Sequence, residues 1–417
     1  MTTILLSDTH PDFWHDALNY PIGLHVVTVP GELLPLFLMK MPHQFLLAAR
    51  MNRGVKVYAV PIEVNGDSTL GLMTVFLDDA DSPLMLWTPL ALDSTSHMLI
   101  QTLLAGTFTI RLFDEHNREL LGYLGVAETP LRSRVRLEHV KLYSLTHELA
   151  HRWKDAGHSW FSLRTIEDDA DAVTVRFETP LYPEDRVFKD ERPDLYRFHG
   201  TKGFSEVPLV KLEPGQFQEV DIILLLQRIF SPEQIYHAPK RHYDGEEIAD
   251  VVVITDNLCL IVQAKDSPNT EQMLNNSLKR KRRKSVKQLD EGCTQIGGAI
   301  NYLDRTRPLV MRIDGRDEVV DLGRRNVLSL VVVREFFLDM YDVYSKRLLQ
   351  LHAQTGLPCI ALDYGELIEY ATFCDSEPLF VNAYFQVFNA ALDGGTYPRL
   401  RFGVRDLFRP DGSFRFS

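Results

Sequence analysis

The sequence lacks the features that mark membrane-spanning and disulfide-rich proteins. No apolar run approaches the roughly 18 residues that a membrane span requires, and the densest, VDIILLLQRIF, is interrupted by charge. The amino terminus, MTTILLSDTHPD, has no basic segment followed by an apolar one, so we expect no secretory signal. Only four cysteines occur, without a CxxC pair, which favours reduced thiols in a cytoplasmic protein.

The chain also lacks an excess of positive charge. Its formal net charge of -12 argues against a globally basic protein that coats nucleic acid, although a local basic groove remains compatible with it. With 45% hydrophobic and 24% charged residues the composition is that of a globular protein. A length of 417 residues exceeds one ordinary core, so we expect two domains, or one domain with a large subdomain.

The first half is rich in predicted β-strands. GLHVVTVP, VKVYAVPIEV and STLGLMTVFL are β-branched or alternating runs, and TFTIRLFDEHNRELLGYLGV indicates a hairpin around DEHNRE. Helical patterns are expected at about 32–50 and 136–154. A segment rich in proline and charge, 178–198, suggests a boundary. We therefore predict a β-rich α+β domain over 1–185 that recognises a substrate or a partner.

The second half alternates helices and strands. An apolar helix, FQEVDIILLLQRIF, precedes two strands, IADVVVIT and LCLIVQAK, and a long polar helix over about 270–303. Two more strands, VLSLVVV and PCIALD, follow among further helices. This order predicts an α/β core over 200–417, with a mixed sheet flanked by helices.

Three polar residues interrupt the end of the predicted strand pair. If Asp256 and Asn257 form the hairpin turn, the register sets Asp250 directly opposite Gln263, about 5 Å apart at Cβ. Lys265, two residues beyond Gln263, shares that face of the sheet. A carboxylate, an amide and an ammonium thus converge at one end of an apolar hairpin. The alternative is an ordinary strand end.

This convergence suits the hydrolysis of phosphodiester bonds. Hard cations such as Mg²⁺ or Mn²⁺ prefer oxygen ligands, which Asp250 and Gln263 supply. Lys265 is placed to orient a water molecule and to stabilise charge that develops on a phosphate.

The pattern of Asp250 followed by Gln263-Ala264-Lys265 resembles the PD-(D/E)XK nuclease superfamily, and its glutamine variant is similar to Mrr-like restriction and defence nucleases. The resemblance covers about 215–305 and loosely extends to 375. It implies that Glu219, on the first helix of the core, joins Asp250 and Gln263 as a metal ligand and catalytic residue, and that Gln288 matches a glutamine of the following helix. Glutamine replaces the usual acidic residue at 263, and EEIAD carries one residue more than the frequent Glu-x-Asp.

The resemblance also implies a biological setting. It suggests a Mg²⁺-dependent deoxyribonuclease in a prokaryotic anti-phage defence or restriction system. DNA is the expected partner, and an ATPase or sensor protein and a homo-oligomer are further expectations.

A run of basic residues, LKRKRRKSVK, leads into the helix that carries Gln288. We predict that it grips the phosphate backbone without regard to sequence. A solvated helix face and a nuclear-localisation patch are the alternatives. The predicted DNA-binding residues are Lys279, Arg280, Lys281, Arg282, Arg283, Lys284 and Gln288.

The five residues His147-Glu148-Leu149-Ala150-His151 form an HExxH pattern, which in zinc peptidases supplies two imidazole ligands and a general base. On a helical wheel Leu149 and Trp153 belong to an apolar stripe, and both histidines lie opposite. No well-spaced third ligand follows. We expect an exposed amphipathic helix, with a zinc metallopeptidase as one alternative function and a catalytically inactive nucleic-acid-binding protein as another.

Overall fold

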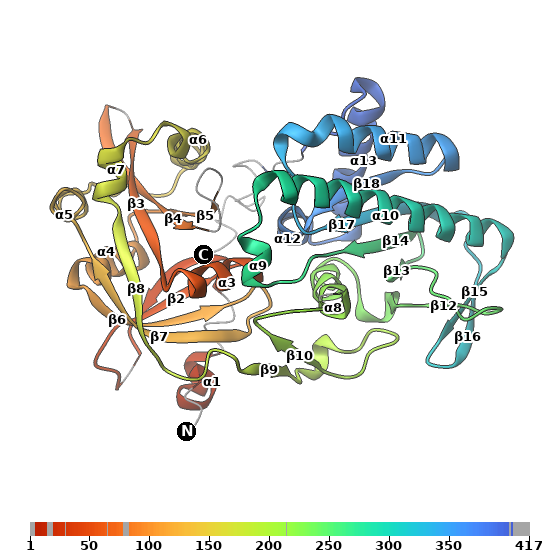
Figure 1. Ribbon diagram of the computed structural model, residues 1–417, viewed down its shortest axis with the longest axis horizontal. Coiled ribbons are helices and arrows are strands. Elements are labelled where there is room, and N and C mark those ends of the chain that lie inside the picture. The colour runs from red at the N-terminus through yellow and green to blue at the C-terminus, as the bar shows by residue number, and fades with distance from the viewer. Residues whose placement is uncertain are drawn as a thin grey trace.

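The computed structural model describes residues 5–14, 20–29, 31–64, 66–77, 83–213, 215–399 and 402. Within its helices, the side chains at 147, 148, 154, 158, 159 and 216 lie outside this description. The fold is mixed α/β, with sheets flanked by helices (Figure 1). Across the described residues, no helix combines the length and the apolar character needed to cross a membrane.

The first half of the chain builds an eight-stranded sheet in the order β1-β2-β6-β7-β8-β3-β4-β5. Neighbouring strands are antiparallel except β2 and β6, which are parallel. The strands are β1 (Gly23–Val27), β2 (Leu36–Lys40), β3 (Gly54–Val64), β4 (Asp67–Phe76), β5 (Leu84–Pro89), β6 (Thr107–Phe113), β7 (Glu119–Glu128) and β8 (Val173–Pro180). The predicted hairpin around DEHNRE is confirmed as β6 and β7.

The helices of this half are α1 (Leu6–Thr9), α3 (His43–Met51), α4 (Ser94–Ala105), α5 (Leu131–Glu138), α6 (His147–Leu163) and α7 (Ile166–Asp171). The predicted helix at 32–50 is wrong in its first part, because Leu36–Lys40 is a strand. Strand β2 pairs on both sides and is buried along its whole length, so its continuous apolar pattern fits a central strand as well as a helix. The predicted helix at 136–154 is divided between α5 and α6.

The second half contains a five-stranded mixed sheet in the order β11-β13-β14-β17-β18. Its first three strands are antiparallel, and β14, β17 and β18 are parallel. The strands are β11 (Ile235–His237), β13 (Val251–Ile254), β14 (Leu258–Lys265), β17 (Asn326–Val333) and β18 (Cys359–Asp363). Strand β14 lies at the centre and is buried on both faces, which explains its unbroken apolar sequence before Gln263.

Helices cover this sheet on both sides, with α10 along one side of β14 and α8 along the other (Figure 1). The helices of this half are α8 (Gly215–Leu226), α9 (Glu271–Leu274), α10 (Leu278–Arg305), α11 (Tyr341–Thr355), α12 (Tyr364–Phe373) and α13 (Glu377–Gly394), of which α9 lies against α3 of the first half. The long helix expected at 270–303 is therefore interrupted, and its first turn is α9. Helix α8 is apolar on nearly every face because it packs between β14 and α12.

Short elements complete the fold. Two small sheets contain β9 (Val187–Asp190) with β10 (Ser205–Pro208), and β12 (Lys240–Arg241) with β15 (Leu309–Ile313) and β16 (Arg316–Val320). Single 3₁₀ turns are η1 (Pro193–Leu195), η2 (Pro232–Gln234) and η3 (Leu338–Met340). The eight-stranded sheet ends at Pro180 and the five-stranded sheet begins at Ile235, so the two sheets are consecutive in sequence.

Candidate functional site

The hairpin of β13 and β14 has the register that its turn predicts. Ile254 pairs with Cys259, and the Thr255 backbone N–H donates to the carbonyl of Leu258 at 2.9 Å. Counting outward, Val251 pairs with Val262, so Asp250 stands at the position opposite Gln263. The two-residue turn therefore fixes the placement of the polar groups at the far end of the hairpin.

Asp250 and Lys265 meet at that end. The carboxylate Oδ2 of Asp250 accepts a hydrogen bond from the backbone N–H of Ala264 at 2.7 Å and lies 3.6 Å from Nζ of Lys265. Asp250 is 8% exposed, and the Lys265 side chain is partly exposed. The carboxylate is thus held by the backbone of the strand that carries Lys265.

The amide of Gln263 completes a cluster of oxygen atoms. Its terminal atom lies 2.9 Å from Oδ2 and 3.2 Å from Oδ1 of Asp250, and 2.9 Å from Oε1 of Gln295. With its nitrogen turned toward them, the amide donates to all three oxygens. With its oxygen turned toward them, the oxygens repel one another unless a cation, or a proton on Asp250, lies between them.

Burial dominates the electrostatics of Asp250. It raises the pKa of this carboxyl to about 6, while Lys265 and the Ala264 N–H act in the opposite direction. The negative charges of Glu219 and Glu247 act on this pKa in the same direction as burial, so both carboxylates are within electrostatic range of Asp250. A site with several carboxylates and one ammonium favours the binding of a cation.

Glu219 reaches this region from α8. Its Oε2 lies 2.8 Å from Nε2 of His237, at the end of β11, and His237 pairs with Val251 next to Asp250. The structure therefore brings Asp250, Gln263 and Lys265 into one cluster, and the negative charge of Glu219 on α8 acts on Asp250. Sequence reasoning missed His237 and Gln295, although Gln295 is seven residues after Gln288 and so shares its helix face.

The predicted basic run forms the first turns of α10, but its residues differ in exposure. Lys279, Arg280 and Arg283 are exposed. Arg282 pairs with Asp339 at 2.8 Å, and Lys284 is partly buried, with its pKa lowered by burial and by nearby arginines.

Two of the predicted DNA-binding residues are buried. Lys281 is 7% exposed, and Gln288 is 6% exposed and donates to Oγ of Ser267 at 3.0 Å. Their assignment to DNA contact is corrected, because they face the sheet side of an amphipathic helix. Gln288 instead fastens α10 to the loop that follows Lys265.

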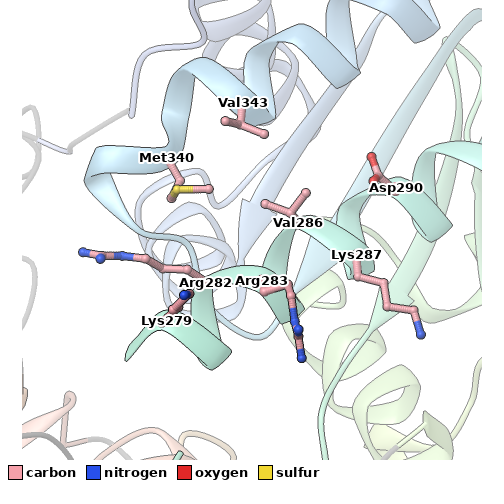
Figure 2. Close-up of a pocket in the computed structure, with 8 residues that line it drawn as sticks. All are labelled: Lys279, Arg282, Arg283, Val286, Lys287, Asp290, Met340 and Val343. Carbon is pink, nitrogen blue, oxygen red and sulfur yellow. The ribbon is translucent and has the colours of Figure 1, made fainter. Parts of the chain in front are cut away.

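A groove with a cationic side runs between α10 and the start of α11. Figure 2 shows Val286 pointing toward Met340 and Val343, with the positively charged groups along the α10 side. The lining residues are Lys279, Arg282, Arg283, Val286, Lys287, Asp290, Met340 and Val343. Asp290 is paired with Arg347, and Arg282 and Lys287 are paired with Asp339 and Glu291. Lys279 and Arg283 therefore leave this surface with an excess of positive charge.

The HExxH residues begin α6, which Thr146 caps. Leu149 and Trp153 are buried as the apolar stripe requires, and His151 is exposed. The side chains of His147 and Glu148 lie outside the described residues, so zinc binding there stays untested.

A second polar cluster lies where the two halves of the chain meet. Potential ligand atoms of Glu115, His116 and Asp221 all lie within 4.8 Å of one another and are buried, so this trio has the spacing of a metal site. However, Asp221 already accepts hydrogen bonds from Arg118 at 2.7 Å and from Lys211 at 2.9 Å. These cations compensate its charge, and we interpret the cluster as a network of ion pairs.

Comparison with known proteins gives no match: no family model, no curated protein and no solved structure is significantly similar to this chain.

Proposed function

We propose that the protein is a metal-dependent nuclease that hydrolyses phosphodiester bonds of DNA, with a core of the PD-(D/E)XK type in its second half. One observation carries the proposal: Asp250, Gln263 and Lys265 converge at the end of a buried hairpin, within electrostatic range of Glu219. A restriction or anti-phage role and an ATPase or sensor partner accompany this proposal through the resemblance alone.

The donor set fits Mg²⁺ or Mn²⁺. Asp250, Gln263 and Glu219 would hold the ion through oxygen atoms, and the bound ion would lower the pKa of a water molecule and polarise the phosphate. Gln263 must then turn its amide oxygen toward Asp250, and Gln295 is positioned to accept or donate as that amide turns.

Lys265 supplies the positive charge of the chemical step. Held 3.6 Å from Asp250, its ammonium stabilises the negative charge that develops on the phosphate as water attacks. The exposed cations of α10 would bind the phosphate backbone of the DNA that is cleaved and account for affinity without sequence preference. They are Lys279, Arg280 and Arg283.

The test is cleavage of duplex and single-stranded DNA by the full chain with Mg²⁺ or Mn²⁺, against an EDTA control. Cleavage that requires metal and disappears in both Asp250→Ala and Lys265→Ala supports the proposal. DNA binding without cleavage under either metal favours the inactive nucleic-acid-binding protein. Cleavage that survives both substitutions places the active site elsewhere.

A further inference from the structure

The loop that joins β6 and β7 extends from the eight-stranded sheet into the second half of the chain. Inside the loop, Oδ1 of Asp114 accepts hydrogen bonds from the backbone N–H groups of His116 and Arg118, both at 2.9 Å. The same carboxylate pairs with Nε of Arg118 at 2.5 Å. The side chains of Asp114 and Arg118 are both 0% exposed. Asp114 thus shapes the loop and directs the guanidinium of Arg118 out of its own sheet.

Arg118 reaches α8. Its Nη2 donates to Oδ1 of Asp221 at 2.7 Å, while Nζ of Lys211 donates to Oδ2 at 2.9 Å. Asp221 is two residues from Glu219 on this helix. The backbone of Lys211 in turn exchanges hydrogen bonds of 3.1 Å and 2.8 Å with Asn269, in the loop after Lys265.

Two further residues of the second half form hydrogen bonds with the β6–β7 loop. The hydroxyl of Tyr364, at the start of α12, donates to Oε1 of Glu115 at 2.6 Å. Arg228, just after α8, donates to the carbonyl of Glu115 at 2.7 Å. Burial, together with the charges of Asp114 and Asp221, raises the pKa of Glu115 to about 7. The loop is therefore held by Asp221 on α8 and by two residues that follow this helix.

We propose that the pairing of Arg118 and Lys211 with Asp221 makes the β6–β7 loop a positioning element of the Asp250 site. This inference rests on the proposed function. The ion pairs fix α8, so that Glu219 stays against His237 and beside Asp250, and Lys211 connects α8 to the loop that follows Lys265. Arg118 is a positioning residue, and docking of the eight-stranded sheet is a condition for full activity.

The test compares three full-length variants. Arg118→Met removes the guanidinium that pairs with Asp221. Asp221→Asn removes the charge of the partner on α8 and retains the shape of the side chain. Arg111→Met is the matched control, because Arg111 forms a similarly buried ion pair of 2.7 Å with Glu119 that joins two strands of the eight-stranded sheet. Readouts are amide hydrogen exchange of α8, Mg²⁺ affinity by calorimetry, kcat, and metal-free DNA affinity.

We expect faster exchange in α8 and a fall of about 10–100-fold in Mg²⁺ affinity and kcat for Arg118→Met and Asp221→Asn, with DNA affinity unchanged. Arg111→Met should leave α8 and the metal site as in the wild type. Equal losses in the control, or wild-type exchange and metal affinity in both folded test variants, overturn the proposal. A wild type that neither cleaves DNA nor binds Mg²⁺ refutes the proposed function, and exchange in α8 then decides separately whether the ion pairs fix α8.

Discussion

Nζ of Lys265 lies 3.6 Å from Oδ2 of Asp250, and the backbone N–H between Gln263 and Lys265 donates to that same oxygen. The ammonium and the carboxylate are therefore held by one strand. Substitutions at Asp250 and at Lys265 can therefore be compared to separate metal binding from the chemical step.

Asp250 should make Mg²⁺ binding dependent on pH near neutrality. Because burial raises its pKa to about 6, protons compete with the metal as pH falls through that value. We expect Mg²⁺ affinity, measured by calorimetry between about pH 5 and 8, to decrease by up to about tenfold per pH unit below the pKa. An affinity that is constant over this range would contradict the role of Asp250.

The same raised pKa predicts the stability of Asp250→Asn. In the folded protein the carboxyl holds its proton more tightly than in the unfolded chain, so its contribution to stability decreases as pH rises from about 4 to about 6. Without metal, Asp250→Asn should therefore equal or exceed the wild type in free energy of unfolding at about pH 8, although it cleaves no DNA. Urea unfolding below and above the folded-state pKa measures this. If Asp250→Asn is much less stable than the wild type above this pKa, the carboxylate of Asp250 stabilises the folded structure.

Lys265→Ala should separate binding from catalysis. The ammonium is not a metal ligand, so Mg²⁺ affinity should remain close to that of the wild type, whereas kcat should fall by about 10²–10³. Steady-state cleavage gives kcat, single-turnover cleavage gives the rate of the chemical step, and calorimetry on the same preparation gives the Mg²⁺ affinity. A loss confined to metal affinity would exclude an electrostatic role in the chemical step.

Gln263→Glu tests the glutamine directly. The new carboxylate would lie where the amide now contacts both oxygens of Asp250 and Oε1 of Gln295, within 2.9–3.2 Å. We expect lower stability without metal, because like charges repel, and equal or higher Mg²⁺ affinity with activity retained. Thermal unfolding with and without Mg²⁺ reports the difference. Gln263→Leu should lose metal affinity, and unchanged affinity in that variant would remove Gln263 from the ligand set.

The exposed cations of α10 should govern the salt dependence of DNA binding. Replacing Arg280 and Arg283 by alanine should weaken binding and lower the slope of log K against log salt by about 0.9 for each phosphate that is no longer neutralised. Arg305→Ala, exposed at the other end of the same helix, is the control. A slope equal to that of the control would make the run a solvated helix face.

The HExxH residues should not bind zinc. The purified protein should contain no stoichiometric zinc by elemental analysis, and the double substitution His147→Ala and His151→Ala should leave DNA cleavage intact. One equivalent of zinc that disappears in the double variant would instead support the peptidase alternative.

The part of the site that the sequence predicts is the part governed by local geometry. A two-residue turn fixes the register of the hairpin, and the alternation of a strand places Gln263 and Lys265 on one face. The contact of Arg118 with Asp221 spans 103 residues and depends on how two sheets dock, for which no local pattern exists. The burial of Lys281 is likewise not predicted, because a run of basic residues does not by itself show which side chain faces the core.

The loop between β6 and β7 also bears on how the protein can be divided and how it can diverge. A fragment that begins near residue 200 would retain Asp221 and Lys211 but leave them without Arg118, in a surface that is buried in the whole chain. Recombination between related chains near residue 200 would join a first half to a second half whose ion-pairing residues evolved in different proteins. We therefore expect substitutions at Arg118 and Asp221 to accumulate together, because each residue compensates the buried charge of the other.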